Sequence, residues 1–364
     1  MFDMFNIGKI IGIPFKRKKY DVYFFIPHMQ TGGAEIVHLY TLEFLKKKGC
    51  KVKVVVTNSH EKDLKEYFVN LASVTDIHYI KYNRKLFQLV LGFYVSLLNK
   101  LENKIFIGSH SYFFYRLIPF LHNKNLTVDV IHNLLYGESI RYEKVFDKIC
   151  DKINKIVCVD CKTSERLREV TQRSDIRVVN NPTDEVFFQN HKIRHSVNKR
   201  CVFVGRDHPD KRIGIIEEIA EDDNIVIGMV GDFSNRETIE SIKYHGLLTN
   251  RPELANVMNE YDILVITSKT EAFPMVIQEA MALGMIVLAT RVGGIDCHIK
   301  DGVNGLLVED GTPEEVANRI KHQINQLSSD RNLAGKISRN AYDYAANHFS
   351  VEKFNQSMSE ILTA

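Results

Sequence analysis

Short apolar runs alternate with longer amphipathic stretches along the first half of the chain. The apolar runs cover residues 21–26, 51–56, 104–108, 127–131, 155–159 and 176–179. The stretches between them include 34–48 and 86–101, where apolar residues recur at helical spacing. Apolar strands that alternate with helices are typical of a parallel sheet covered on both faces. We therefore predict an α/β fold for this half.

A polar break follows at Asn180-Asn181-Pro182, and the alternation restarts at residue 201. The second set of predicted strands covers 201–205, 224–230, 262–267, 285–290 and 305–308, and predicted helices cover 313–327, 333–347 and 351–362. A chain of 364 residues suits two domains of ordinary size. We expect an N-terminal Rossmann-like domain at 1–180, a linker at 181–200, a second Rossmann-like domain at 201–345 and a final helix at 346–364.

The composition is that of a core-forming protein, with 45% hydrophobic and 10% aromatic residues. No apolar run reaches the length of about 18 residues that a membrane-spanning helix needs. The first fifteen residues lack the basic start and small-residue cleavage site of a secretory signal. We therefore expect the protein in the cytoplasm.

Charge is distributed unevenly, although the formal net charge is only +3. Residues 1–180 hold 29 basic and 18 acidic residues, and the remainder holds 19 and 27, so the two parts carry +11 and −8. Nucleic acid is not the expected partner, because its usual recognition motifs are absent. Basic clusters at 16–19, after an apolar leader, and at 46–48 favour an anionic membrane surface on the inner face of the cell membrane. A merely solvated basic face is the alternative.

The most informative stretch runs from the strand at 262–267 to the strand at 285–290. A loop carrying Glu271 leads into a helix that opens at Pro274 and ends before Gly284. The free N–H groups and positive dipole end of such a helix make a phosphate site at the edge of a parallel sheet. Glu271 and Glu279 flank that site. The alternative is an ordinary strand–helix–strand unit with two surface glutamates.

The stretch from Thr267 to Val308 resembles the Glu-x7-Glu motif of the family-4 retaining glycosyltransferases, also called glycosyltransferases group 1. The resemblance continues through Glu279-Ala-Met-Ala-Leu-Gly284, the pair Gly293-Gly294 and the turn 301–305. It implies the GT-B architecture, in which two Rossmann-like domains face each other across a cleft. The nucleotide sugar would be bound mainly by 201–310 and the acceptor by 20–140, and the final helix would pack back on the N-terminal domain.

The resemblance also implies roles for individual residues of the second half. Gly205-Arg206 and Lys211 would clamp the donor diphosphate, which two cations after a strand can also do on electrostatic grounds. Glu271 would contact the sugar hydroxyls and Glu279 the ribose hydroxyls. The first turn of the helix would offer backbone N–H groups. The expected donor-binding residues are Gly32, Gly33, Gly205, Arg206, Lys211, Glu271, Phe273, Met275, Val276 and Glu279.

In the first half, the resemblance points to two loops that follow strands. Gly32-Gly33 opens a helix after the first strand, where glycine lets the backbone approach a ligand. Three histidines, His28, His110 and His132, also follow strands. His132 matches the family's sugar-contacting histidine and is favoured over His110. The expected catalytic residues are Glu271, His132, Arg206 and Lys211.

The expected activity is transfer of a sugar, with retention of configuration, from a nucleotide diphosphate sugar to a glycan. A UDP-sugar is favoured as the donor, and a lipid-linked glycan of bacterial surface polysaccharide or lipopolysaccharide synthesis as the acceptor. No Asp-x-Asp triplet occurs in the chain, so neither a metal nor another cofactor is expected. The alternatives are a non-catalytic GT-B-like subunit that steers a partner transferase, or another nucleotide-sugar enzyme such as an epimerase.

Overall fold

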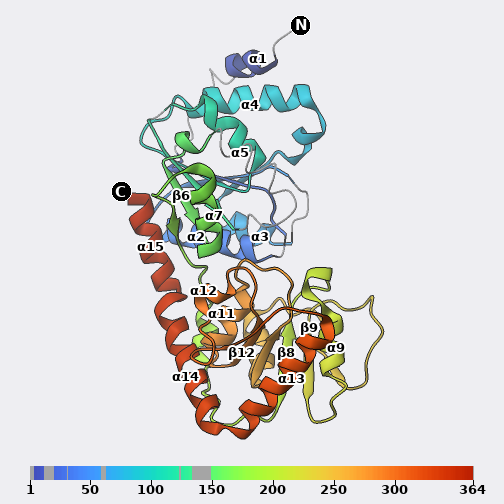
Figure 1. The fold of residues 1–364 in the computed structure, drawn as a ribbon. Helices are drawn as coiled ribbons and strands as arrows, with labels where there is room; N and C mark the ends of the chain where they lie inside the picture. Colours follow the sequence, from blue (N-terminus) through green and yellow to red (C-terminus); the bar gives the residue numbers. More distant parts are fainter. Residues whose placement is uncertain are drawn as a thin grey trace. The chain divides into compact units, whose positions relative to one another are not determined.

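The computed structural model of the chain describes residues 4–11, 20–30, 32–58, 63–122, 124–132 and 149–363. The chain divides into two compact units (Figure 1). The first comprises Met1–Val179 with Asn355–Ala364, and the second comprises Asn180–Phe354. Each unit has its own parallel sheet and its own apolar core, which confirms the predicted α/β fold of two Rossmann-like domains.

The sheet of the first unit has seven parallel strands in the order β3-β2-β1-β4-β5-β6-β7. The order reverses at β1, which pairs with β2 on one side and β4 on the other. Ligands of such sheets bind outside the carboxyl ends of the strands at the point of reversal. The strands are β1 (Val22–Ile26), β2 (Val52–Val56), β3 (Ser73–Asp76), β4 (Ile105–Ser109), β5 (Leu126–Ile131), β6 (Lys155–Cys158) and β7 (Arg177–Val178).

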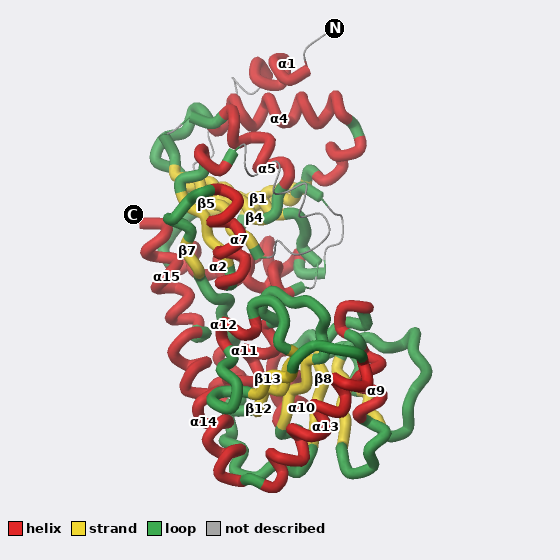
Figure 2. The backbone as a smooth tube through the Cα atoms, in the orientation of Figure 1, coloured by secondary structure: helices red, strands yellow, loops and turns green. Residues whose placement is uncertain are grey.

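Helices cover both faces of this sheet, with α2 and α3 on one face and α4 and α5 on the other (Figures 1 and 2). Burial from both sides explains the continuous apolar runs of the strands, and all five residues of β1 are buried. The helices are α1 (Met4–Ile11), α2 (Gly33–Lys47), α3 (Lys65–Leu71), η1 (His78–Tyr82), α4 (Arg84–Leu98), α5 (Tyr112–Leu117), η2 (Ile118–Phe120), η3 (Cys150–Lys152) and α7 (Cys161–Thr171).

The described part of the apolar leader, Met4–Ile11, forms α1, which packs against α4 (Figure 1). The two helices cross at glycines. A Cβ atom on Gly8 would lie 2.0 Å from the Leu89 carbonyl oxygen, and one on Gly92 would lie 1.9 Å from that of Phe5. Only glycine permits so close an approach of two backbones. Residues 4–11 of the leader are therefore part of the packing of the first unit.

The second unit has a six-stranded parallel sheet in the order β10-β9-β8-β11-β12-β13. Its order reverses at β8, which pairs with β9 and with β11. The strands are β8 (Arg200–Val204), β9 (Val226–Val230), β10 (Ile242–Tyr244), β11 (Ile263–Ile266), β12 (Ile286–Thr290) and β13 (Leu306–Val308). The helices are α8 (Glu185–Gln189), η4 (Pro209–Lys211), α9 (Ile213–Ile219), α10 (Arg251–Asn259), α11 (Met275–Ala282), α12 (Ile295–His298), α13 (Pro313–Ser329) and α14 (Arg331–His348).

This sheet separates two apolar cores. On β11, Ile263 and Val265 join the core shared with α9 and α13, whereas Leu264 and Ile266 join the core shared with α10 and α11. Successive side chains of a strand point to opposite faces, so each strand contributes to both cores. The sheet edge that carries the loops is thereby held between two packed layers.

All the predicted strands are present, with ends that differ by at most two residues. Two strands were missed, β3 and β10. Both are short, lie at sheet edges and contain polar residues, so they lack the apolar run that marks a strand buried on both faces.

The predicted linker at 181–200 is wrong, because this segment is packed into the second unit. Phe187 is fully buried, and Arg194 is only 2% exposed. The Arg194 guanidinium donates to Asn259 Oδ1 at 2.8 Å and to the Leu283 carbonyl oxygen. A buried cation needs such acceptors, and they fix the segment in place. At least one of the basic residues that suggested a linker, Arg194, is thus an internal hydrogen-bonding group.

The last helix, α15, spans Val351–Thr363, and its residues from Asn355 onward belong to the first unit. Within the ranges that the structure describes, we find no helix with both the length and the apolar character to cross a membrane.

Candidate functional site

The carboxyl ends of β8 and β11 are neighbours at the point where the strand order of the second sheet reverses. Gly205 and Arg206 follow β8, and Glu271 lies in the loop that follows β11. The structure therefore brings these predicted site residues to the edge where α/β sheets bind ligands.

The loop that carries Lys211 is tied to the end of β11. The hydroxyl of Thr267 donates to the Lys211 carbonyl oxygen at 2.7 Å, and the Lys269 N–H donates to the Asp210 carbonyl oxygen at 2.8 Å. Arg206 is exposed and has no ion-pair partner among the described residues. Of the predicted clamp, Lys211 thus lies on an anchored loop, and the Arg206 side chain is available to a ligand.

Glu271 is a buried carboxylate with 7% of its surface exposed. Its Oε1 atom forms an ion pair with Lys211 Nζ and accepts a hydrogen bond from Ser268 Oγ at 2.6 Å. Its Oε2 atom has no hydrogen-bond partner within the described part of the chain. Burial of a carboxylate is costly unless it is paired. Lys211 and Ser268 offset that cost at one oxygen and leave the other for a ligand.

Gly293 fixes the loop that carries Glu271. Its φ is +56°, and a Cβ atom there would lie 1.6 Å from the Glu271 carbonyl oxygen. The next residue, Gly294, donates its N–H to the Ala272 carbonyl oxygen at 2.8 Å. The glycine pair after β12 therefore packs directly against the backbone of the glutamate loop, which no larger residue at 293 would allow.

The N-terminus of α11 follows that loop. Pro274 occupies the N-cap position, and the helix runs from Met275 to Ala282. Leu283 is the C-cap residue, and Gly284, whose φ is +67°, follows it. The first-turn N–H groups of Met275 and Val276 have no acceptor within the helix. Together with the dipole they favour an anion here, as the sequence predicted.

Glu279, on the second turn of α11, is buried with 3% of its surface exposed. Its Oε1 atom forms an ion pair with Nη2 of Arg251, the first residue of α10. The Arg251 guanidinium carbon lies 4.7 Å from the centroid of the Phe187 ring. We find no described hydrogen-bond partner for Glu279 Oε2. Each glutamate of the motif thus has one oxygen held by a cation and one oxygen unpartnered.

Phe273 does not present its ring to a ligand. It is 5% exposed, and its ring centroid lies 4.2 Å from that of His298 and 5.5 Å from that of Phe349. Its side chain belongs to the core, since burial of an aromatic ring is strongly favourable. Phe273 can therefore serve a donor only through its backbone.

Three histidines gather at the carboxyl edge of the first sheet. The backbone N–H of His132 donates a hydrogen bond to His110 Nε2 at 2.8 Å. The accepting Nε2 atom of His110 is therefore unprotonated. The ring of His38, on α2, lies 5.2 Å from the ring of His132, and its Nε2 atom lies 2.8 Å from Ser109 Oγ. The structure therefore places His132 in a cluster with His110 and His38.

The three clustered histidines and Asp129 of the first unit are held neutral. Burial lowers the pKa of His38 to about 3 and that of His110 to about 4, and it lowers the pKa of His132 well below its usual range. Asp129, on β5, is fully buried, and burial raises the pKa of its carboxyl to about 8. Near neutral pH the carboxyl edge of this sheet therefore offers neutral hydrogen-bonding rings.

Gly32 and Gly33 open α2 in the first unit. Gly32 is the N-cap residue and accepts a hydrogen bond from the Ile36 N–H at 3.1 Å. A Cβ atom on Gly32 would lie 2.4 Å from Glu35 Oε2, so the buried Glu35 side chain folds back over this turn. The structure gives Gly32 a local packing role, and a role in donor binding stays a prediction.

Sequence reasoning missed three polar residues that organise these sites, namely Arg251, Ser268 and His38. Ser268 lies only three residues before Glu271, a spacing that could have suggested its hydrogen bond. Arg251 lies 28 residues before its partner, and His38 lies 71 residues before Ser109. No local pattern signals such distant pairs.

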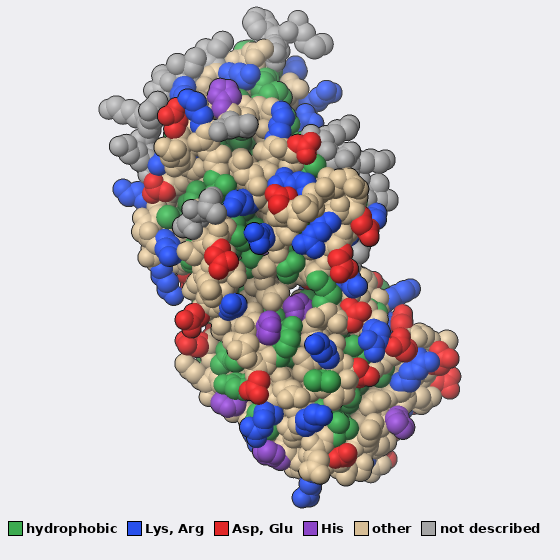
Figure 3. All heavy atoms as spheres, turned by 60° about the vertical axis from the view of Figure 1, so that its left-hand side comes forward, with side chains coloured by type: hydrophobic (Ala, Val, Ile, Leu, Met, Phe, Trp, Pro, Cys, Tyr) green, Lys and Arg blue, Asp and Glu red, His purple; other side chains and the backbone are tan. Residues whose placement is uncertain are grey.

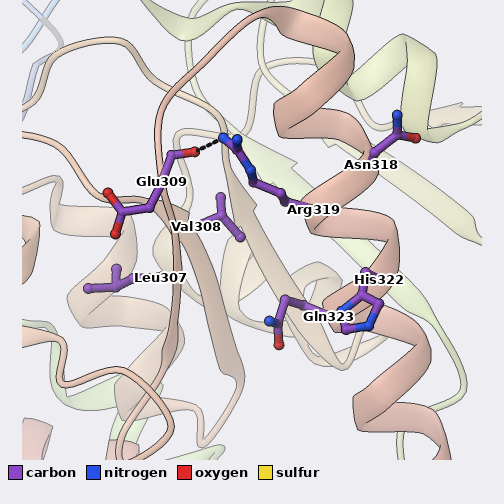
Figure 4. Close-up of a pocket in the computed structure, with 7 residues that line it drawn as sticks. All are labelled: Leu307, Val308, Glu309, Asn318, Arg319, His322 and Gln323. Carbon is purple, nitrogen blue, oxygen red and sulfur yellow. Dashed lines mark hydrogen bonds between the residues drawn. The ribbon is translucent and has the colours of Figure 1, made fainter.

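A separate cavity of about 400 Å³ lies between β13 and α13 (Figure 4). Its lining includes Glu309, Arg319, His322 and Gln323, and none of the predicted site residues is among them. In the described ranges no cluster of three or more His, Cys, Asp or Glu side chains could hold a metal ion.

Basic and acidic side chains are intermixed on the face drawn in Figure 3. On this face, the charge difference between the two halves of the chain is therefore not gathered into one patch of a single sign.

Comparisons with known proteins agree with this geometry. A family model described as glycosyl transferases group 1 matches residues 187–344, which lie within the second unit. An uncharacterised glycosyltransferase of Methanocaldococcus jannaschii is 28% identical over 236 residues, or 63% of this chain and 64% of that protein. The lipopolysaccharide core biosynthesis glycosyltransferase LpsE of Rhizobium meliloti is 24% identical over 222 residues, or 57% and 64% of the two chains. The chain spans slightly less than two thirds of both relatives.

The fold is also found among solved structures. Anabaena HepE in complex with UDP superposes with a TM-score of 0.75 at 19% identity, covering 94% of this chain and 99% of that one. This likeness shows the two-domain GT-B fold.

Proposed function

We propose that the chain is a group 1 glycosyltransferase and, more narrowly, a retaining, metal-independent hexosyltransferase. It moves a sugar from a nucleotide diphosphate sugar to a glycan. The observation that carries the proposal is the sheet edge where Lys211, the N-terminus of α11 and two half-paired buried glutamates meet. Cations and an anion-favouring helix end suit a diphosphate, and unpartnered carboxylate oxygens suit hydroxyls.

In the proposed reaction, the bond between the sugar C1 and the leaving phosphate oxygen breaks while a bond from an acceptor hydroxyl oxygen to C1 forms on the same face. The acceptor proton passes to the leaving diphosphate, so no enzymatic nucleophile takes part. Arg206, Lys211 and the first-turn N–H groups of α11 stabilise the charge that develops on the diphosphate. Glu271 binds sugar hydroxyls through its unpartnered oxygen. His132 stays our candidate for a further contact with the sugar.

UDP is the favoured nucleotide. The support is a fold neighbour, HepE, that was crystallised with UDP. The acceptor is proposed to be a glycan, in the class of surface polysaccharide or lipopolysaccharide intermediates, as the name of the relative LpsE suggests.

A lipid-linked acceptor would place the protein on the inner face of the cell membrane, and the surface of the first unit supports this part of the proposal. Residues 78–120 contain six Lys or Arg and only one acidic residue, Glu102. Tyr79, Tyr82 and Tyr112 are each more than half exposed in the same segment. Basic residues with interfacial aromatic rings favour an anionic lipid surface. The basic cluster at 16–19 lies outside the described residues.

The membrane proposal predicts binding to vesicles that contain anionic lipid, with reversal by salt because the attraction is electrostatic. Sedimentation with vesicles at low and high salt measures this, with vesicles of neutral lipid as the control. Neutralising Lys16–Lys19 should weaken binding. Absence of binding at low salt would refute membrane association and leave the transferase proposal intact.

The transferase proposal is tested by incubating the purified chain with a panel of nucleotide sugars and measuring release of nucleoside diphosphate. Slow donor hydrolysis, lost in Glu271→Ala, supports it and needs no acceptor. A change of sugar without release of nucleoside diphosphate would indicate an epimerase. Binding without turnover, and without turnover when glycan acceptors are added, would indicate a non-catalytic subunit.

A further inference from the structure

Glu279 and Arg251 form a pair that parallels Glu271 and Lys211. In both pairs the Oε1 atom of a buried carboxylate forms an ion pair with a basic side chain. The Oε2 atom of the same carboxylate has no partner among the described residues. The motif accounts for Lys211 but not for Arg251. We infer that Arg251 is a positioning residue that aims the free oxygen of Glu279 at the ribose hydroxyls of the donor. The inference rests on the proposed function.

Arg251 is fixed on three sides. It is the first residue of α10, whose N-cap Asn250 accepts a hydrogen bond from the Glu253 N–H at 3.0 Å. Its guanidinium lies over the Phe187 ring at 4.7 Å and donates to Glu279. Planar guanidinium groups stack on aromatic rings and hold carboxylates in a defined orientation, which lysine does not do. Arg251 therefore sets the orientation of the Glu279 carboxyl plane before a ligand arrives.

Such a constraint is useful because Glu279 sits on a buried face of α11. A mobile carboxylate would lose rotamer freedom on binding, and a fixed one has already lost it. Arg251 itself needs no contact with the ligand in this arrangement.

The pairing predicts how the donor is recognised. With Oε1 held by Arg251, Oε2 accepts hydrogen bonds from the ribose hydroxyls. Hydrogen bonds to a charged group are among the stronger ones, so loss of both hydroxyls should weaken binding of the nucleotide by about tenfold or more. Without Arg251 the carboxylate is free to turn, and the preference for a nucleotide that carries ribose hydroxyls is lost.

The probes are UDP, 2′,3′-dideoxyuridine diphosphate and inorganic pyrophosphate, and the readout is their dissociation constants by titration calorimetry on the full chain. We expect the wild-type protein to bind UDP about tenfold or more tightly than the dideoxy analogue. In Arg251→Gln this ratio should fall to about one or two, with the affinity for pyrophosphate unchanged. Arg251→Lys should restore part of the ratio, because it keeps the charge but not the planar contact.

Matched variants separate positioning from general stability. Glu279→Gln should abolish the same preference for UDP over the dideoxy analogue. The double variant, Arg251→Gln with Glu279→Gln, should show no further loss of that preference, since Arg251 acts through Glu279. Lys243→Ala removes an exposed ion pair of the same unit, with Glu260 at 3.0 Å, and should keep the ratio. Thermal unfolding of each variant checks that the protein is folded.

Two results would overturn the inference. If Arg251→Gln is folded and keeps the full preference for UDP while Glu279→Gln loses it, Arg251 does not position Glu279. If the pyrophosphate affinity of Arg251→Gln falls as much as its UDP affinity, Arg251 acts on the phosphates or on the fold instead. Failure of the wild-type protein to bind any nucleotide would refute the proposed function itself, which is a different outcome.

Discussion

The two glutamates at the site of the second unit and the histidine cluster of the first unit are buried by opposite means. In the second unit, Glu271 and Glu279 are buried as ion pairs with Lys211 and Arg251. In the first unit, the histidines beyond β4 and β5 and the carboxyl of Asp129 are held neutral by burial. Both sheets have the same topology at the point where the strand order reverses. The same scaffold therefore offers one edge of fixed charges and one edge of neutral hydrogen-bonding groups.

This difference suggests a division of labour. A diphosphate carries charge that grows during the proposed reaction, so it needs fixed cations and a helix end. A sugar or glycan presents neutral hydroxyls, which neutral rings bind without the cost of burying a charge. The charged edge suits the nucleotide, and the neutral edge suits hydroxyl groups.

The largest expected effect comes from Lys211→Ala. Loss of this cation removes stabilisation of the leaving diphosphate and leaves Glu271 buried without its ion pair. Donor turnover should fall by about 10³-fold, as when one stabiliser of a transition-state charge is lost. Donor hydrolysis measures the change. Lys211→Met with Glu271→Gln should recover stability but not turnover, and a double variant as active as wild type would contradict the role of the pair.

A backbone change tests whether the charged edge depends on the glycine pair. Gly293→Ala puts a Cβ atom on the Glu271 carbonyl oxygen, so it should cost about 3 kcal/mol or more of stability and lower turnover. Gly302→Ala is the matched control, because its φ of +69° is equally left-handed but nothing lies within 4 Å. It should cost only about 1 kcal/mol. Urea unfolding measures the free energy of unfolding of both variants. Equal losses of this free energy would show that the left-handed backbone conformation alone, and not the contact with Glu271, determines the cost.

The neutral edge makes a prediction about pH through Asp129. The pKa of its carboxyl is raised to about 8 by burial, so the native state keeps a proton that the unfolded chain releases above about pH 4. Its contribution to stability is therefore present at low pH and is lost as pH rises towards 8, by about 1.4 kcal/mol per pH unit. Asp129→Asn should remove this slope, measured by urea unfolding at several pH values. The exposed Asp151→Asn is the control and should leave the slope unchanged.

His38 should show the opposite sign and a somewhat smaller effect. The pKa of His38 is lowered to about 3 by burial, and the unfolded chain takes up a proton below about pH 6.5. Its contribution is therefore present above pH 6.5 and is lost as pH falls towards 3. His38→Gln keeps a hydrogen-bonding group near Ser109. Between about pH 3 and pH 6.5 this variant should take up about one proton fewer than the wild-type protein on unfolding. His122→Gln, on an exposed loop, should not; equal effects would contradict the neutral burial of His38.

Local patterns in the sequence predicted most of the fold. The strands of both sheets are buried on two faces, so their apolar runs stand out, and only the polar edge strands β3 and β10 were missed. The segment 181–200 was misjudged because its polar letters look like a linker. Arg194 is polar for a different reason, since it satisfies carbonyl groups inside the second unit.

The candidate site was predictable in its motif and not in its partners. Glu271, Lys211 and the start of α11 occupy the edge that the motif implies. The ion pair of Arg251 with Glu279 and the contacts of His38 join distant elements, so their existence depends on tertiary packing. Phe273 shows the reverse case, because a residue inside the motif proves to be part of the core.

The most direct test of the central claim compares UDP affinity in variants of the two edges by titration calorimetry. If the charged edge binds the nucleotide, Lys211→Met with Glu271→Gln should weaken UDP binding by about 10- to 100-fold, the range for hydrogen bonds to a charged group. His132→Ala should change it by less than about twofold, since His132 is assigned to hydroxyl groups and not to phosphate. If the histidine variant weakens UDP binding as much as the variant of the charged pair, the division between the two edges is wrong.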